Sequence, residues 1–210
     1  MTPSYCRLFL ATPERFDLSE MQTVLQAAIA AGDIASLLIR HEDADKQKQA
    51  AQGLTKMAQD AGIAVLIDND AGLALSCRAD GVQVDGFAED YQAAREMLGA
   101  EAIVGVFCGT NRHSAMSLAE SGADYVAFSQ EAVAGENEPI GHWWARVFEV
   151  PCVVQVKELD ASRNSVAGLA VANQVDFICP PATMWTSETQ AGDTVRQFNS
   201  MIREIPIETS

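Results

Sequence analysis

The amino-acid sequence predicts a single α/β domain, over residues 1–210, whose eight parallel strands close into a (β/α)8 TIM barrel. Short runs of apolar and β-branched residues alternate with amphipathic segments along the whole chain, a pattern typical of βα units built on a parallel sheet. Eight such units favour closure into a barrel. The strands are expected at about residues 5–10, 34–39, 63–67, 80–84, 102–107, 124–128, 152–156 and 175–179.

The segments between the strands have the periodicity of helices. One apolar stripe consists of Leu18, Met21, Leu25, Ala28 and Ile29, and another of Leu54, Met57, Ala58 and Ala61. Stripes with this spacing lie on one face of a helix, which can then cover a pair of strands. Asp17 with Glu20, and Ser187 with Gln190, have the spacing of capping boxes, so helices are expected to begin at both places.

A weak repeat supports the same architecture. A small or apolar residue followed by aspartate stands directly before four of the expected strands, at Gly32-Asp33, Ala79-Asp80, Ala123-Asp124 and Val175-Asp176. An aspartate at such a turn can accept hydrogen bonds from nearby backbone amides, so we expect these four to stabilise the bottom of the barrel. The competing fold, an open doubly wound sheet, lacks its usual signatures, because the sequence has neither G-x-G-x-x-G after the first strand nor a P-loop.

Composition limits the partners and the compartment. A formal net charge of −15 disfavours nucleic acid and anionic membranes, since long-range repulsion opposes the encounter. The longest apolar runs fall short of the roughly 20 residues that cross a bilayer, and no secretion signal is seen at the N-terminus. Five cysteines without a Cys-x-x-Cys pair are typical of reduced thiols. We therefore expect a cytoplasmic protein with a small-molecule ligand, either monomeric or a homo-oligomer.

Polar residues stand at the carboxyl ends of several expected strands, where barrels of this class place their active sites. Asp68, Asn69 and Asp70 end a wholly apolar strand, and together with Asp85 they can hold Mg²⁺. The alternative is that Asp70 caps a short helix at Ala71 to Ser76 while Asp68 stays solvated.

Three further candidates follow other strands. Arg40 can bind a phosphate or carboxylate, or can pair with Glu42 or Asp68. Gln83 lies at the fourth strand. Lys157 can form an imine with a carbonyl substrate, or can pair with Glu158.

The histidines and two of the tryptophans give no clear indication of a site. His41, His113 and His142 are scattered, so a histidine metal site is not expected and surface positions are. Trp143 and Trp144 begin a helix after an acidic, Gly-rich stretch, so residues 131–144 form either a lid or ordinary packing.

Several segments resemble one family. Ala61 to Asp70, Leu73 to Leu75 and Ala79 to Val84 resemble the third and fourth βα units of thiamine phosphate synthases and their TenI-type relatives, and Ser121 to Val126 continues the likeness. The match is clear over about residues 30–127. It implies the same barrel and a transferase that couples a hydroxymethylpyrimidine pyrophosphate to a thiazole phosphate, with Mg²⁺ and basic groups holding the pyrophosphate as it leaves.

The resemblance assigns roles to the candidates. Arg40 stands at the Arg of the family's Gln-x-Arg-x-Lys motif, and Gln83 stands where the family has a His. With Asp68, these two are the expected catalytic residues. Asn69, paired with Asp68 in reversed order relative to the family's Asn-Asp, is expected to bind the cofactor together with Lys157. Asp70 and Asp85 are the expected metal ligands.

The chain departs from the family at other motif positions. Leu38 and Glu42 replace the Gln and Lys around Arg40. The Gly-Gly phosphate loop after the seventh strand reads Val156-Lys157-Glu158-Leu159, and the loop after the eighth reads Cys179-Pro180-Pro181. Proline has no backbone N–H to offer a phosphate.

Three hypotheses follow from these observations. The chain is a diverged thiamine phosphate synthase acting on the family's substrates or on related compounds, a ligand-binding or regulatory barrel without catalysis, or an unrelated barrel enzyme that uses Lys157 through an imine.

Overall fold

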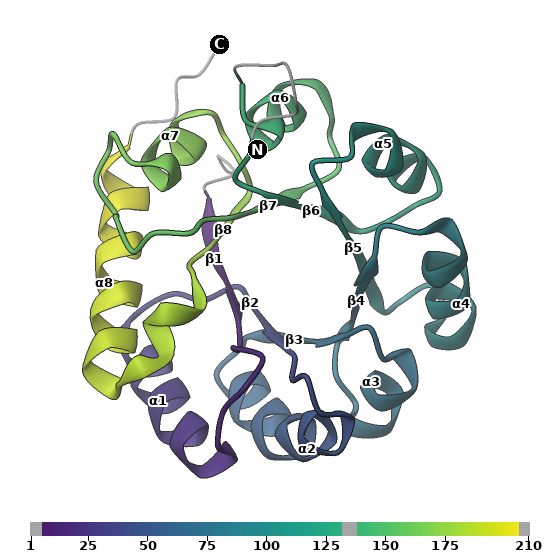
Figure 1. The fold of residues 1–210 in the computed structure, drawn as a ribbon, viewed down its shortest axis with the longest axis horizontal. Coiled ribbons are helices and arrows are strands. Elements are labelled where there is room, and N and C mark those ends of the chain that lie inside the picture. Colours follow the sequence, from purple (N-terminus) through teal and green to yellow (C-terminus); the bar gives the residue numbers. More distant parts are fainter. Residues whose placement is uncertain (1–5, 132–137, 206–210) are drawn as a thin grey trace.

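The computed structural model describes residues 6–131 and 138–205 and shows a closed ring of parallel strands surrounded by helices (Figure 1). Around the ring the strands are β1 (Arg7–Ala11), β2 (Ser36–Ile39), β3 (Ala64–Asp68), β4 (Gly81–Asp85), β5 (Ile103–Gly109), β6 (Tyr125–Ser129), β7 (Cys152–Gln155) and β8 (Phe177–Cys179). Because β8 pairs with β1, the sheet has no free edge. The predicted (β/α)8 barrel is confirmed, and each expected strand overlaps an observed one.

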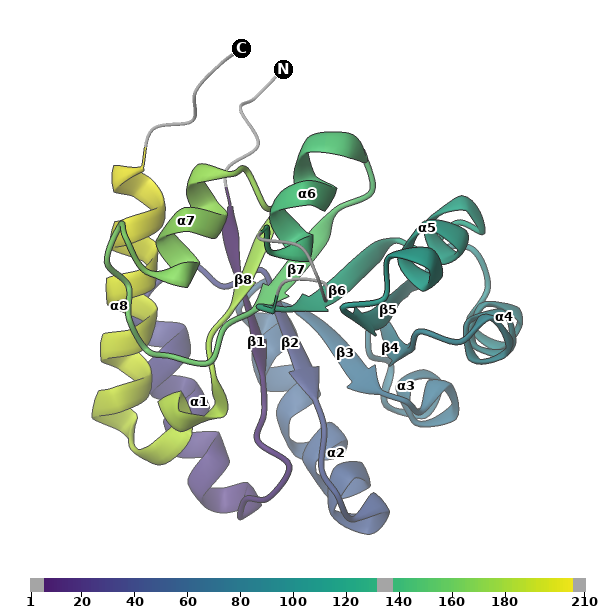
Figure 2. The ribbon, with the colours of Figure 1, turned by 45° about the horizontal axis from the view of Figure 1, so that its top comes forward.

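The helices follow the strands in strict alternation. They are α1 (Leu18–Ala31), α2 (Ala44–Asp60), α3 (Ala71–Cys77), α4 (Ala88–Leu98), α5 (Arg112–Glu120), α6 (Ile140–Val147), α7 (Val166–Ala172) and α8 (Glu188–Glu204), with a 3-10 helix, η1 (Ala182–Thr186), between β8 and α8. The last helix packs beside the first, as both ribbon views show (Figures 1 and 2). This contact completes the helical layer where the chain returns to its start.

The two helix starts expected from capping residues are confirmed. The Asp17 side chain accepts hydrogen bonds from the backbone amides of Ser19 and Glu20 at the start of α1. Ser187 accepts one from the amide of Gln190 at the start of α8. Each cap satisfies a backbone donor that the first turn of a helix leaves without a partner.

Alternate residues of each strand belong to two different cores. Side chains facing into the ring form one cluster, which contains Phe9, Ala11, Leu38, Leu66, Tyr125, Ala127, Val153 and Cys179. The residues between them face outward and pack under the helices in a larger cluster. Burial on both faces explains why the strands read as continuous apolar runs in the sequence.

The four repeated aspartates join the strands in pairs at the bottom of the barrel. Three of them accept a backbone N–H from the preceding strand: Asp80 from Val65 at 2.7 Å, Asp124 from Val104 at 2.7 Å and Asp176 from Cys152 at 2.8 Å. The fourth, Asp33, binds the side chain of Arg7. The expected backbone bonding is therefore confirmed at three positions, and each aspartate links an odd-numbered strand to the next strand.

Glycine at position 105 makes room for an aromatic ring inside the barrel. Gly105 pairs with Tyr125 across β5 and β6, and a Cβ built on Gly105 would lie 2.0 Å from Cζ of the Tyr125 ring. No side chain fits at that distance, so the tyrosine can occupy the interior only because β5 has no side chain there.

We predict that Gly105→Ala lowers the free energy of unfolding by about 2–3 kcal/mol, because the ring of Tyr125 or the strand must shift. Gly72→Ala is the matched control. A Cβ on Gly72 meets only ordinary contacts, 3.5 Å or more away, and alanine favours the helix. Urea unfolding of the two variants and the wild type measures the difference. Equal stability of all three proteins would contradict the steric argument.

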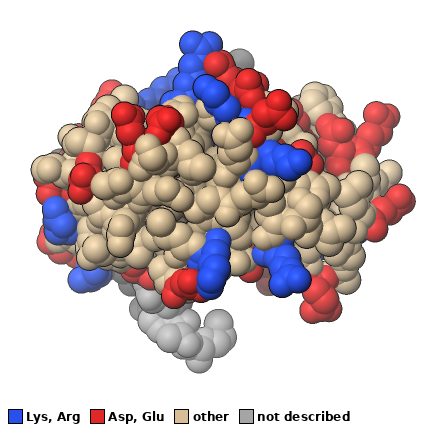
Figure 3. Space-filling model, turned by 90° about the horizontal axis from the view of Figure 1, so that it is seen from below, with Lys and Arg blue, Asp and Glu red and all other residues tan. Residues whose placement is uncertain are grey.

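The outer surface carries both signs of charge. On the face drawn in Figure 3, Lys and Arg side chains lie singly or in small groups among Asp and Glu, without a continuous basic surface. Among the residues that the structure describes, no helix combines the length and apolarity that a membrane span requires.

Candidate functional site

The carboxyl ends of the strands, here called the mouth, hold the candidate site; the arrowheads of β2 and β3 in Figure 2 point to this end. Arg40 follows β2 and is fixed there by Thr12, which is fully buried. The Nε of Arg40 donates to the carbonyl oxygen of Thr12 at 2.7 Å, and the backbone amide of Arg40 donates to the Thr12 hydroxyl at 2.9 Å. These bonds hold the guanidinium in place before a ligand arrives.

Within the residues that the structure describes, Arg40 forms an ion pair with neither of its expected partners, Glu42 and Asp68. Glu42 does not take it, because its carboxylate pairs with Arg15 at 2.6 Å. The positive charge of Arg40 acts instead on the carboxyl of Asp68, where it favours the ionised form. Within residues 6–131 and 138–205, the Arg40 side chain uses only Nε for hydrogen bonding, so its two terminal nitrogens are available to an anion.

Asp68 and Gln83 lie side by side, because they pair in register across β3 and β4. Gln83 lowers the pKa of the Asp68 carboxyl and is 3% exposed. The hydroxyl of Tyr125 donates to Oε1 of Gln83 at 3.0 Å. Two expected catalytic residues, Asp68 and Gln83, are therefore in contact, and a tyrosine that the sequence did not single out fixes the orientation of the glutamine amide.

The environment of Asp68 favours its neutral form. The pKa of this carboxyl is raised to about 6, mainly by burial and also by the negative charges of Asp85 and Glu14, against the opposing effects of Arg40 and Gln83. A carboxyl with such a pKa exchanges its proton near neutral pH, a property common at sites that handle charge.

Asn69 joins the end of β3 to the end of β4 through two hydrogen bonds, here called the clasp. Asn69 has a positive φ of 51°, which asparagine tolerates better than most residues. Its backbone N–H donates to the backbone carbonyl oxygen of Gln83 at 2.8 Å, and its side-chain Oδ1 accepts the backbone N–H of Asp85 at 2.9 Å. The Asn69 side chain thus shapes the loop that presents Asp85, whose carboxylate is exposed.

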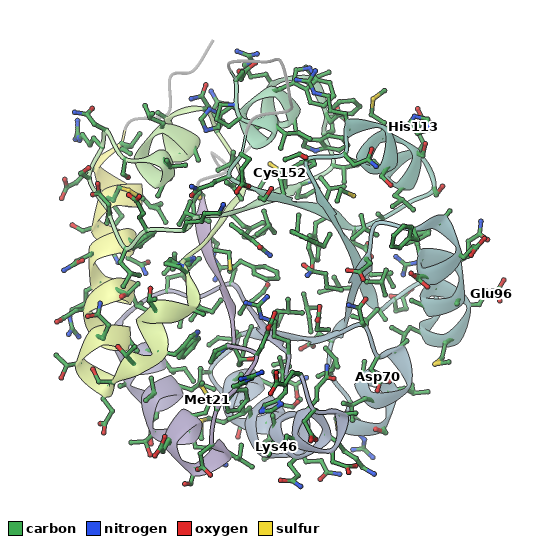
Figure 4. The ribbon with its side chains drawn as sticks, in the orientation of Figure 1. Met21, Lys46, Asp70, Glu96, His113 and Cys152 are labelled. Carbon is green, nitrogen blue, oxygen red and sulfur yellow. The ribbon has the colours of Figure 1, made fainter. Side chains whose placement is uncertain are left out.

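Asp70 has a structural partner. It lies at the start of α3, outside the ring of strands (Figure 4), and Oδ1 accepts the backbone N–H of Leu73 at 2.7 Å as the N-cap of that helix. The capping role of Asp70 that the alternative expected is confirmed, whereas Asp68 is half-buried and not solvated. Metal binding by Asp70 and Asp85 stays a prediction. In the described part of the chain, no three His, Cys, Asp or Glu side chains group closely enough to hold an ion by themselves.

Lys157 lies on the opposite side of the mouth, after β7. Its ammonium group forms an ion pair with Glu131, which lowers the pKa of that carboxyl to about 2. Its backbone amide donates to Oε1 of Gln130 at 2.8 Å. The lysine is largely exposed and is paired, although with Glu131 instead of the expected Glu158. Its predicted role in cofactor binding remains a prediction.

The loop after β8 is held by an aromatic residue. Trp185 in η1 is buried, and its Nε1 donates to the carbonyl of Ala11 at 2.7 Å. Pro180 and Pro181 precede it where a phosphate-binding loop would offer amides. Neither Trp185 nor Thr12 was singled out in the sequence, because each makes its key bond to a distant backbone atom that no local pattern encodes.

The histidines and tryptophans are only partly as expected. The expected surface position of His142 is wrong: it is 7% exposed, and burial lowers its pKa. Trp144 is fully buried and stacks on Phe148 at 4.0 Å, so it is packing. His113 lies on α5 at the outside of the ring (Figure 4). Residues 132–137 of the expected lid lie outside the described residues.

A closed parallel barrel with titratable groups gathered at the carboxyl ends of its strands defines a (β/α)8 protein that binds its ligand at that end. The family model described as thiamine monophosphate synthase matches residues 8–134. The chain belongs to this family.

Individual proteins that are similar to this chain support the same family. The chain is 35% identical to a thiamine-phosphate synthase of Rhodospirillum centenum, over 94% of this chain and 98% of the relative, and 30% identical to one of Hyphomonas neptunium, over 95% of each. In fold it is similar to a thiamine phosphate pyrophosphorylase from Pyrococcus furiosus, with a TM-score of 0.73, 17% identity and coverage of 96% and 98% of the two chains.

We predict that Asp68→Asn stabilises the protein at pH 7 by roughly 1–3 kcal/mol, because it removes a half-buried charge whose pKa is raised in the folded state. A raised carboxyl pKa gives stability that is complete at low pH and is lost as the pH rises from about 4 to above 6. The difference between variant and wild type should therefore vanish below pH 4. Urea unfolding at pH 4 and pH 7 measures it, and a constant difference would contradict the assignment.

Proposed function

We propose that this protein catalyses the thiamine-phosphate synthase reaction, in which the methylene carbon of a pyrimidine diphosphate bonds to the ring nitrogen of a thiazole phosphate and diphosphate leaves with the electron pair. The single observation that carries the proposal is the placement of Arg40 and Asp68 directly after the paired residues Ile39 and Ile67, with Arg40 fixed by Thr12 and its terminal nitrogens available. The relatives named for this activity match nearly the whole chain, which supports it.

The residues at the mouth would have different roles in the reaction. Arg40 would bind oxygens of the diphosphate and stabilise the negative charge that grows there as the bond to carbon breaks. Gln83, held by Tyr125, would keep the Asp68 carboxyl pointed into the site. The clasp of Asn69 on the amide of Asp85 would keep the two carboxylates at a fixed separation.

Asp68 and Asp85 fit a divalent cation. The negative charge of Asp85 raises the pKa of the Asp68 carboxyl, and a cation between the two side chains would offset that repulsion. Mg²⁺ is commonly held by one or two carboxylates together with substrate phosphates, so these two side chains suffice without a third protein ligand. When bound, Mg²⁺ would neutralise charge on the diphosphate.

A ligand-binding barrel without catalysis is the second candidate, and one observation favours it. The side of the mouth after β7 and β8, where a thiazole phosphate would need donors, has Lys157 paired with Glu131 and a proline at position 181. Such a barrel would bind one substrate and form no product.

We predict product formation from both substrates with Mg²⁺, and a loss of roughly 100-fold or more in kcat/KM for Arg40→Ala, because charge stabilisation in the transition state is lost. Arg40→Lys should recover part of the rate. Arg196→Ala is the control, since Arg196 is exposed on the outer helix α8 and pairs with Asp193. Thiamine phosphate is measured by liquid chromatography.

Calorimetry with each substrate separates the two candidates. Heat of binding without product would favour the ligand-binding barrel. Neither heat nor product, with folded protein, would refute both.

A further inference from the structure

The barrel contains a cavity at the end opposite the mouth. It has a volume of about 190 Å³ and lies among interior-facing side chains from six strands: Phe9, Leu66, Ile103, Tyr125, Val153 and Phe177. Phe9, Leu66 and Val153 are almost completely buried, whereas Ile103 and Phe177 are half-buried and border the opening to solvent. The walls of this cavity are thus nearly all apolar.

The cavity exists because the first interior layers of the barrel contain small residues. Ser36 lines it, and Gly81 pairs in register with Leu66 and Ile103, so that its missing side chain would have faced the same interior. A Cβ on Gly81 would lie 1.9 Å from the carbonyl oxygen of Ile103. The glycine is therefore required by strand packing, and the volume that it leaves cannot be filled from β4.

Tyr125 and Asp124, two polar residues near this cavity, have partners inside the protein, whereas the hydroxyl of Ser36 has none among the described residues. The hydroxyl of Tyr125 donates to Gln83, on the side of the mouth. Asp124 at the rim accepts the guanidinium of Arg95 at 2.6 Å and the amide of Val104 at 2.7 Å. An occupant therefore meets mainly aromatic and aliphatic surface, together with the hydroxyl of Ser36, and the nearby carboxylate disfavours an anion.

We propose that this cavity is a second binding site, separate from the mouth, for a neutral monocyclic aromatic molecule. Its volume exceeds the roughly 150 Å³ of apolar cavities known to bind benzene. Phe9 and Tyr125 meet edge to face, with ring centroids 5.6 Å apart, and present ring surfaces against which another ring can pack in the same manner. The proposal does not depend on the reaction at the mouth.

Toluene tests the site in the intact chain. Methyl NMR spectra should show saturable shifts at Leu66 and Val153, with little change at the exposed methyls of Leu75 on α3, and the melting temperature should rise with toluene concentration. Benzoate, with the same ring and a negative charge, should give neither effect. Failure of toluene to saturate these methyl shifts up to its solubility, or equal effects of benzoate, would overturn the proposal.

Two variants fill the cavity and one serves as a control. Ser36→Leu and Val153→Phe add carbon atoms to its wall and should weaken toluene binding by about tenfold or more. Ser200→Leu is the same serine-to-leucine substitution at an exposed position of α8 and should leave toluene binding unchanged. Undiminished binding in either folded filling variant would refute the site. If both fail to fold, the location of the methyl shifts in the wild type decides.

Discussion

The closure of eight parallel strands into one ring is the constraint on which the other features depend. Once β8 pairs with β1, alternate residues of every strand face a single enclosed space, and each must fit against residues from across the ring. The ring of Tyr125 can lie there only because Gly105 has no side chain. From the bottom of the barrel to the mouth, the interior side chains change from aromatic to polar. The hydrogen bond from Tyr125 to Gln83 lies where this change occurs.

Much of the fold could be predicted from the sequence because its determinants are local. Strands buried on both faces leave apolar runs, and the aspartates before β4, β6 and β8 mark where they begin. The site was predicted less completely. Arg40 and Asp68 were identified by their positions after strands, but the bond between Tyr125 and Gln83 joins residues 42 positions apart. His142 was misplaced because it lies on the buried face of its short helix beside Ile140 and Trp144, and histidine occurs both at surfaces and in interiors.

The two sides of the mouth differ in what they offer a ligand. After β2, β3 and β4, Arg40, Asp68 and Asp85 are held by backbone and side-chain bonds yet keep groups available for binding. After β7 and β8, Lys157 is neutralised by Glu131, and prolines occupy the turn that Trp185 fastens to β1. The β2–β4 side of the mouth is therefore the side whose charged groups stay available to a ligand.

The four aspartates at the bottom divide the ring into quarters, each made of two neighbouring strands with a helix between them. Their side chains reach back only 26, 15, 20 and 24 residues, at Asp33, Asp80, Asp124 and Asp176 respectively, whereas joining β8 to β1 spans almost the entire chain. Loop-closure entropy is smallest for the short spans. A polypeptide cut in the turn after α2, α4 or α6 would keep every aspartate with its own strand pair. The two fragments from such a cut are therefore suited to reassembly by complementation.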